Sequence, residues 1–415
     1  MRKIVDLHLH SKYSRATSKQ LDLTELAKWG RIKGLDIISC ADFTHPKWLT
    51  HIRETLVEDG SGLLDHPREK GIKFLLSTEV ACIYSHAGSV RRLHHLILAP
   101  SLSAVEKINT ALTVRGCKLA SDGRPILGLS SKELLQIVLG ADARCMLIPA
   151  HAWTPWFAIF GSKSGYDSVE DCFEDLAPHI HALETGLSSD PEMNWSLSKL
   201  DRYALVSNSD AHSGPKMGRE ANVFDLAETS YDAIVDAITS RDPRKFLYTI
   251  EFFPEEGMYH YDGHRLCDVN FAPFETRTRG ELCPVCKKSL TIGVLHRVDN
   301  LRDRELGTRP TNTIPFKKIV PLPEIIADFF MVASSSKKVM ELFFNIVHDG
   351  RSEFSVLLDM AHDELKKIMP EQLADGIMRV RSGDVRVIPG YDGKYGIVSV
   401  FSDIQRRHSK QETLL

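Results

Sequence analysis

The chain has 415 residues, of which 43% are hydrophobic and 26% charged, a composition typical of a folded globular protein with two or three domains. No apolar run approaches the roughly 18–20 residues of a membrane span, and no signal segment precedes Asp6, so we expect a protein of the cell interior without a membrane partner. The net charge of −3 excludes a chain that is basic throughout, so any nucleic-acid surface has to be local.

A buried strand is predicted at the start of the chain, where apolar residues occupy positions 4, 5, 7 and 9. Residues two apart on a strand point to the same face, so Asp6, His8 and His10 lie together. Burying three polar side chains is costly unless they share a partner, and imidazole and carboxylate groups are ligands of Zn, Mn and Fe. Two histidines at this spacing are weak evidence by themselves.

Six further strands are predicted, and each carries His, Asp or Glu, in most cases near its C-terminal end. With the first strand, they cover residues 3–9, 37–43, 73–82, 91–99, 145–152, 182–185 and 204–210. Helices are expected among them at 22–33, at 47–58 and near 130–139, and this alternation is typical of a parallel α/β sheet or barrel.

The active sites of such barrels lie at the C-terminal ends of the strands, so we expect these polar side chains to share a metal site. The candidate ligands, or residues that orient ligands, are His8, His10, Asp42, His45, Glu79, His95, His151, Glu184, Asp210 and His212.

A second metal site is predicted after a connection at 226–259. Cys267 is followed, after fifteen intervening residues, by Cys283-Pro-Val-Cys286, and His264 stands three residues before Cys267. This spacing suits one structural zinc in a ribbon or knuckle within 260–310, with His260 and His296 as alternatives to His264. Five other cysteines lie mostly among apolar neighbours and are expected to be reduced core thiols: Cys40, Cys82, Cys117, Cys145 and Cys172.

The last predicted domain, 311–415, carries apolar residues at helical spacing, such as Ile325, Phe329 and Phe343. A hairpin is expected between Val385–Ile388 and Ile397–Phe401, and the final residues from Arg406 are polar. Gln411-x-x-Leu414 is too short for a full sliding-clamp motif, so a sliding-clamp partner is not supported. The first domain is assigned to 1–225.

The order of these groups resembles the PHP metal-dependent phosphoesterases, and longer stretches resemble the endonuclease Q family of DNA repair nucleases. The stretches that carry this resemblance are 11–17, 42–46, 184–186, 209–212 and 218–220. The resemblance covers essentially the whole chain. It implies a distorted (β/α)7 barrel with a small appended zinc domain and a helical C-terminal region.

The resemblance also implies the activity. The protein would be a metal-dependent endonuclease that cuts double-stranded DNA on the 5′ side of uracil, hypoxanthine, xanthine or an abasic site, and it would be cytoplasmic and nucleoid-associated. Two divalent ions, or three, are expected from Zn, Mn and Mg, with Glu79 as a bridge and Asp210 as a catalytic ligand. Some PHP members have a further histidine soon after the first pair, where this chain has Tyr13-Ser14-Arg15; Arg15 is therefore expected to contact phosphate.

The loop at 152–165 gathers aromatic residues directly after His151. These residues form either a satellite core or a platform for an everted base, and the family resemblance favours the platform. The candidate contacts are Trp153, Trp156, Phe157, Lys163 and Ser164.

Two other functions fit parts of this pattern. A small-molecule phosphatase of the histidinol-phosphate type needs neither the zinc unit nor the long extension after residue 225. A non-catalytic, helicase-associated DNA-binding module would be supported by a missing metal ligand, and the ligand set is largely intact.

Overall fold

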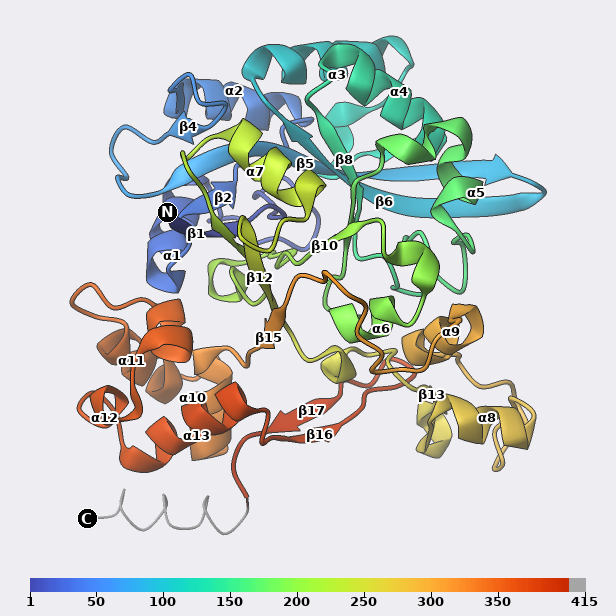
Figure 1. Cartoon of the computed structure of the whole chain (residues 1–415), viewed down its shortest axis with the longest axis vertical. Coiled ribbons are helices and arrows are strands. Elements are labelled where there is room, and N and C mark those ends of the chain that lie inside the picture. The colour runs from blue at the N-terminus through green and yellow to red at the C-terminus, as the bar shows by residue number, and fades with distance from the viewer. Residues whose placement is uncertain (403–415) are drawn as a thin grey trace.

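The sheet at the centre of the protein combines parallel and antiparallel strands (Figure 1). The computed structural model describes residues 1–402. Within these residues the sheet has eleven strands, and its longest continuous order is β15 (Phe316–Lys318), β12 (Phe246–Glu251), β11 (Ala221–Asp225), β1 (Arg2–Asp6), β2 (Ile37–Ser39), β5 (Lys73–His86), β4 (Leu64–Asp65) and β3 (Val57–Glu58). The remaining strands lie off this path: β6 (Ser89–Ala99) and β7 (Ile126–Leu127) pair with β5, and β8 (Met146–Pro149) pairs with β6.

Every predicted strand is present, and the α/β fold is confirmed. A separate parallel pair, β9 (Ala182–Glu184) and β10 (Ala204–Val206), lies next to the main sheet through contacts between β8 and β9. The expected alternation of strand and helix does not run through the whole sheet: β3, β4 and β5 follow one another as antiparallel neighbours, and β5 turns back directly into the antiparallel β6. Ala87 and Gly88 form that turn with positive φ angles of 49° and 74°, the conformation of a tight hairpin turn.

The expected helix ends are confirmed where capping residues mark them. In α1 (Leu23–Lys33), Asp22 accepts a hydrogen bond from the N–H of Glu25, and Gly34 ends the helix at a φ of +89°. In α4 (Ser131–Ala141), Ser130 and Glu133 form a capping box. The helix expected at 47–58 is α2 (Pro46–Thr55), which is shorter because residues 57–58 form β3. The other helices of this part are α3 (Leu102–Val114), α5 (Val169–Phe173), α6 (Pro191–Trp195) and α7 (Tyr231–Ser240).

Alternation along the first strand separates core from polar side chains. Val5 and Leu7 belong to an apolar cluster with residues of β2, β5, β6 and β8, and α7 covers this cluster with Ile234 and Ile238. Asp6 and His8, at the alternate positions, are equally buried but have polar partners. The packed strands therefore hold these buried polar side chains in fixed positions.

The sheet continues beyond residue 225, which we predicted as the end of the first domain. β12 comes from the expected connection and β15 from the expected helical domain, and they extend the sheet from β11. Figure 1 shows the unit of β13 (Asp262–His264), β14 (Val269–Phe271), α8 (Pro273–Arg279) and α9 (Val294–Leu301) at the lower right, opposite the C-terminal helices.

The C-terminal helices and hairpin are confirmed. α10 (Leu322–Phe330) buries Ile325 and Phe329, and α11 (Lys337–Ile346) buries Phe343; α12 (His362–Leu365) and α13 (Glu371–Ser382) follow. β16 (Arg386–Ile388) and β17 (Ile397–Ser399) form the antiparallel hairpin, whose loop accepts the N–H of Tyr261 at the carbonyl of Gly390. Residues 406–415, including Gln411 and Leu414, lie outside the described residues.

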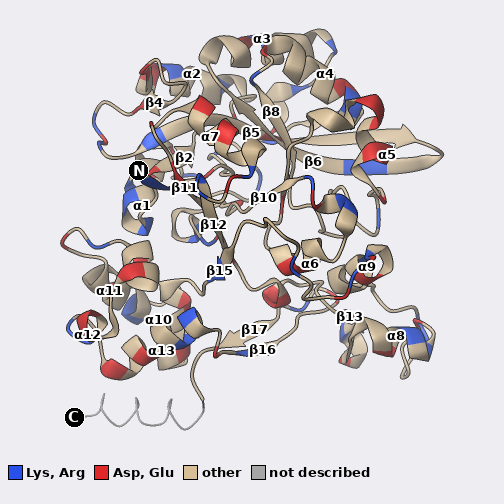
Figure 2. Ribbon diagram, in the orientation of Figure 1, with Lys and Arg blue, Asp and Glu red and all other residues tan. Residues whose placement is uncertain are grey.

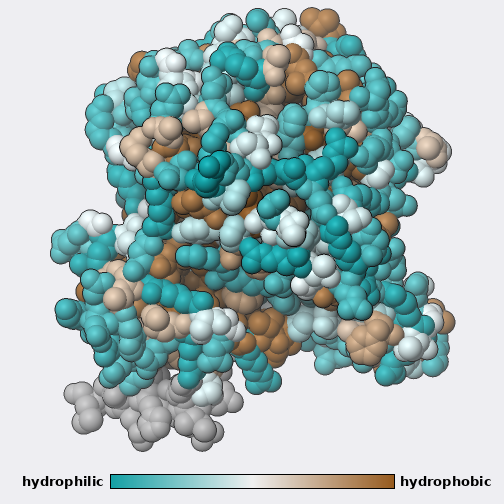
Figure 3. Space-filling view, viewed as in Figure 1, coloured by the Kyte–Doolittle hydropathy of each residue, from teal (hydrophilic) through white to brown (hydrophobic). Residues whose placement is uncertain are grey.

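A buried ion pair fastens the helical part to the sheet part. The ammonium of Lys33 at the end of α1 lies 2.5 Å from the Glu353 carboxylate, and both side chains are almost fully buried. Charged residues elsewhere are interspersed along the ribbon (Figure 2), and the face seen in Figure 3 is largely hydrophilic. None of the described helices combines the length and the hydrophobicity that crossing a membrane would require.

Candidate metal centre

Four side chains from three distant parts of the chain meet beyond the C-terminal ends of the strands. His8 and His10 follow β1, Glu79 lies within β5, and Asp210 follows β10; the nearest ligand atoms of these residues all lie within 4.8 Å of one another. His10 Nε2 is 2.8 Å from Asp210 Oδ1 and 3.3 Å from Glu79 Oε2. His8 Nε2 lies 3.5 Å from the same Glu79 oxygen. This arrangement offers two nitrogens and two carboxylates to one cation.

A second group shares Glu79 with the first. His94 Nδ1 lies 2.7 Å and His151 Nε2 3.1 Å from Glu79 Oε1, and the two ring nitrogens are 3.1 Å apart. One carboxylate oxygen therefore faces each group. Lone pairs from two imidazoles and a carboxylate that converge in this way are the donor set of a second divalent ion.

The buried atoms fit a metal ion better than they fit one another. His8 Nε2 is fully buried and, within residues 1–402, has no hydrogen-bond partner. Such an atom costs free energy unless something binds it. Burial lowers the pKa of His94 to about 4, which keeps this imidazole in the neutral form that metals bind. Burial opposes ionisation of Glu79, but His94, Arg124 and His8 together hold its pKa well below the usual value.

Residues behind the ligands fix their orientation. Glu184 accepts the Nδ1–H of His8 at 3.0 Å and the backbone N–H of His151 at 2.8 Å, so it holds a ligand of each group. Asp42 accepts the backbone N–H and the hydroxyl of Ser11, and its other oxygen lies 3.3 Å from His10 Nδ1. The predicted alternatives for Glu184 and Asp42 were ligand or orienting residue, and these contacts are those of orienting residues.

The expected ligand His95 is replaced by its neighbour His94. His95 pairs with Val80 and His94 with Ala81, and adjacent residues on a strand face opposite sides. His95 Nε2 lies 2.7 Å from the Ser131 hydroxyl on the far side of β6, away from Glu79. The register of β6 against β5 identifies His94, because it is the histidine that shares a face with Glu79 in this antiparallel hairpin.

Three other predicted residues lie at the edge of the centre. The ring of His45 stacks on Tyr13, with centroids 4.3 Å apart, and is in neither group. His212 lies beside His10, and its Nδ1 is 2.9 Å from the Asp210 carbonyl oxygen. Arg15 is exposed, whereas Arg124, which we did not predict, places Nη1 2.9 Å from Glu79 Oε2.

The aromatic loop after His151 divides between core and surface. Trp153 is fully buried and donates its Nε1–H to Asn194, so its assignment to a base platform is wrong. The ring of Phe157 lies against that of His94, with centroids 4.6 Å apart and the planes tilted by 36°, and Trp156 is 40% exposed beside Tyr259. Lys163 is exposed, but Ser164 is buried and donates its hydroxyl to the Arg92 carbonyl.

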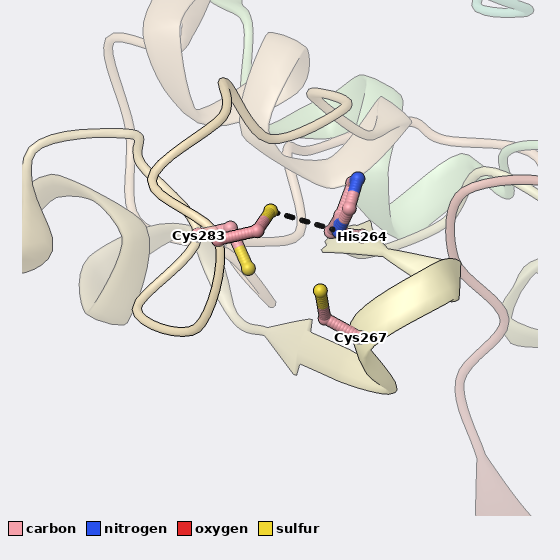
Figure 4. A group of neighbouring side chains, drawn as sticks. His264, Cys267 and Cys283 are labelled. Carbon is pink, nitrogen blue, oxygen red and sulfur yellow. Dashed lines mark hydrogen bonds between the residues drawn. The ribbon is translucent and has the colours of Figure 1, made fainter.

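The cysteine unit gathers the four residues expected from the sequence. His264, Cys267, Cys283 and Cys286 have their ligand atoms within 4.8 Å of one another, and Figure 4 shows His264, Cys267 and Cys283 around one space. Cys286 Sγ lies 3.6 Å from His264 Nδ1. His296 instead places Nδ1 2.6 Å from Asp262, and His260 lies outside the group, so His264 is the histidine that this geometry favours.

Comparison with known sequences relates the chain to proteins of two organisms. Residues 321–384 match the family model of the MJ0043 C-terminal domain. The chain is 30% identical to the uncharacterized protein MJ0043 of Methanocaldococcus jannaschii over 60% of its own length, but it covers 31% of that protein. It is 27% identical to the uncharacterized protein YqxK of Bacillus subtilis, with 95% of this chain and 99% of YqxK aligned.

Comparison with solved structures gives two matches over nearly full length. The lesion-specific endonuclease PfuEndoQ of Pyrococcus furiosus superposes with a TM-score of 0.86 at 29% identity, covering 97% of this chain and 96% of that one. Endonuclease Q in complex with a 27-mer duplex that carries an abasic lesion superposes with a TM-score of 0.85 at 28% identity, covering 98% of each chain. The resemblance to the endonuclease Q family is therefore confirmed over nearly the whole chain.

Proposed function

We propose that the protein is a metal-dependent DNA repair endonuclease that hydrolyses the phosphodiester bond 5′ of a deaminated base or an abasic site. The observation that carries this proposal is the pair of ligand groups that share Glu79. Two adjacent divalent ions supply an activated water and neutralise charge on the phosphate and the leaving oxygen, the chemistry that phosphodiester hydrolysis needs. Because these ligand groups lie at the ends of the strands, as in metal-dependent barrels, we assign the main sheet together with β9 and β10 to a distorted (β/α)7 barrel of the PHP type.

The ligand types favour Zn or Mn over Mg. His8, His10, Glu79 and Asp210 would hold one ion, and Glu79, His94 and His151 the other. Magnesium prefers oxygen ligands and retains several waters, whereas the four imidazoles suit Zn, and the two carboxylates also accept Mn. A third, structural zinc would bind His264, Cys267, Cys283 and Cys286.

Lesion recognition would use the part of the aromatic loop that remains accessible. Phe157 lies against His94, and Trp156 and Lys163 are exposed on the same loop. An everted base could stack on these aromatic side chains next to the metal centre, while Lys163 contacts the backbone phosphate. A damaged pair costs less to open than an intact one, which gives selectivity without reading sequence.

Asp210→Asn tests the catalytic part of this proposal. Asparagine keeps the size of the side chain but removes a charged ligand, so we expect cleavage to fall at least about a thousandfold. Binding to a lesion duplex, measured by fluorescence anisotropy in the presence of EDTA, should stay within a few fold of the wild type. Loss of binding in the variant would assign Asp210 a structural role instead.

One assay separates the proposed function from its alternatives. A labelled duplex with one deoxyuridine, one deoxyinosine or one abasic site is incubated with Mn²⁺ or Mg²⁺, beside an undamaged duplex, histidinol phosphate and an EDTA control. We expect a metal-dependent nick 5′ of the lesion and no release of phosphate from histidinol phosphate. Phosphate release without nicking would identify a small-molecule phosphatase, and binding without any hydrolysis would identify a non-catalytic module.

A further inference from the structure

Arg124 lies at the metal centre with most of its hydrogen-bonding capacity unused. Its Nη1 donates to Glu79 Oε2 at 2.9 Å, and within residues 1–402 this is the guanidinium's one hydrogen bond. A guanidinium has five N–H donors, so four remain available. The side chain is 26% exposed, the same fraction as Asp210, while Glu79, His8 and His10 are sealed. Arg124 and Asp210 therefore reach solvent at the opening of the site.

The pairing of β7 with β5 brings the residues just before β7, including Arg124, close to Glu79. β7 runs parallel to β5 and pairs Ile126 with Ala81. The carbonyl of Pro125 accepts the N–H of Ala81 at 3.0 Å, which extends this pairing toward the centre. Arg124 precedes Ile126 by two residues, as Glu79 precedes Ala81, and its Nη1 lies 2.9 Å from Glu79 Oε2.

The loop before β7 is built tightly against the network that orients His10. Asp122 Oδ1 accepts the N–H of Arg124 at 3.0 Å and that of Arg15 at 3.3 Å. A side chain at Gly123 would come within 2.3 Å of Asp42 Oδ2, so only glycine fits there. The loop that presents Arg124 is thus fixed to the segment carrying His10.

We propose that Arg124 is a catalytic residue that binds the scissile phosphate: one N–H holds Glu79, and the free N–H groups bind a non-bridging phosphate oxygen. This inference rests on the proposed phosphodiester chemistry and deepens it. A planar guanidinium pairs well with phosphate oxygens, and its charge is fixed, so it stabilises charge that develops in the transition state.

In this role Arg124 adds a fixed positive charge beside the two ion groups. Both Asp42 oxygens are already occupied by protein donors or by His10, and His45 is stacked away from the centre. Among residues 1–402, the His, Cys, Asp and Glu side chains form two candidate ion groups at this site and one in the cysteine unit. The expected content is therefore two ions in the catalytic site and one zinc in the cysteine unit.

Three variants test this role: Arg124→Gln, Arg124→Lys and the control Arg115→Gln. Arg115 is an exposed arginine at the end of α3, 3.7 Å from Glu133. Each protein is assayed on bis(4-nitrophenyl) phosphate and on the lesion duplex, with inorganic phosphate as a competitor. Metal content and thermal unfolding are measured on the same preparations.

For Arg124→Gln we expect kcat on the diester to fall about a hundredfold, in the range found when one oxyanion donor is removed. Inhibition by inorganic phosphate should weaken about tenfold, in keeping with the loss of a charge-assisted pair. Arg124→Lys should recover part of the kcat and part of the phosphate inhibition, because lysine keeps the positive charge but not the paired N–H groups of the guanidinium. Metal content and unfolding temperature should match the wild type, and Arg115→Gln should be unchanged throughout.

Two results would overturn the role of Arg124. One is wild-type kcat and phosphate inhibition in Arg124→Gln; the other is loss of bound metal or of folding in that variant, which would make the arginine a structural support for Glu79. Failure of the wild type to nick a lesion duplex, with diester hydrolysis and phosphate inhibition still dependent on Arg124, would reject the proposed DNA function and leave this inference standing. A wild type that neither hydrolyses the diester nor binds phosphate contradicts both.

Discussion

At the scale of single residues, the metal centre depends on which face of a strand each side chain occupies. His94 and His95 are neighbours in sequence, yet one contacts Glu79 and the other Ser131. The sequence predicts a histidine from this strand, but choosing between adjacent histidines requires the register of β6 against β5. Arg124 shows the same limit, because its relation to Glu79 arises from β7, a strand of two residues with no pattern of its own.

His94→Ala and His95→Ala should distinguish a metal ligand from a residue that only stabilises the fold. We expect His94→Ala to lose one divalent ion per chain and to lose cleavage, because it removes a ligand of the second group. His95→Ala should keep its metal content but lower the free energy of unfolding by about 1–3 kcal/mol, since it leaves the buried Ser131 hydroxyl without that partner. Metal analysis after dialysis and urea unfolding measure both effects. Equal metal loss in the two variants would contradict this assignment.

At the scale of elements, the centre is built where strands end in unusual backbone conformations. Asp42, His151 and Asp210 all have positive φ, at 38°, 32° and 47°. Non-glycine residues rarely adopt this region, and such strain persists where surrounding contacts hold it, often at functional sites. The strand periodicity in the sequence predicts that these residues follow strands. It carries no information about their positive φ angles, which are set by contacts with other segments.

Gly186→Ala should test how closely these strand ends depend on one another. Gly186 has a φ of +61°, and an added Cβ would lie 2.6 Å from the Cβ of His151. Gly116 also has a positive φ, +80°, but a Cβ there would meet nothing within 4 Å. We expect both alanine variants to lose about 1 kcal/mol of stability through backbone strain. Only Gly186→Ala should also bind the second metal ion more weakly in a calorimetric titration; equal affinity in both would refute this dependence.

At the scale of the whole molecule, the helical C-terminal part packs on the end of α1 through a buried charge pair. Lys33 and Glu353 are both nearly inaccessible, and Glu353 also accepts the N–H of Leu322 at 2.8 Å. The helical stripe in the sequence correctly predicts α10 and α11 but not their partner, because apolar periodicity identifies a buried face without identifying what covers it. The edge strand β15 escapes prediction for a similar reason, since it has three residues and forms only by pairing with β12.

Lys33→Met should destabilise the protein by about 3–5 kcal/mol, the range found when one partner of a buried pair is removed, because Glu353 keeps an uncompensated charge. The double variant Lys33→Met/Glu353→Gln should recover part of that loss by removing the charge. Thermal unfolding of the full chain measures both, and limited proteolysis shows whether residues 321–402 detach first. Additive losses in the double variant would mean that the two residues do not act as a pair.

We propose that distant strand ends form one centre for two divalent ions. Anomalous diffraction from crystals grown with Zn²⁺ or Mn²⁺ tests it most directly. We predict two peaks about 3.5–4 Å apart on either side of the Glu79 carboxylate, the separation usual for two-metal hydrolases. One peak should be bound by His8, His10 and Asp210, and the other by His94 and His151. A single peak, or ions bound away from Glu79, would contradict the account.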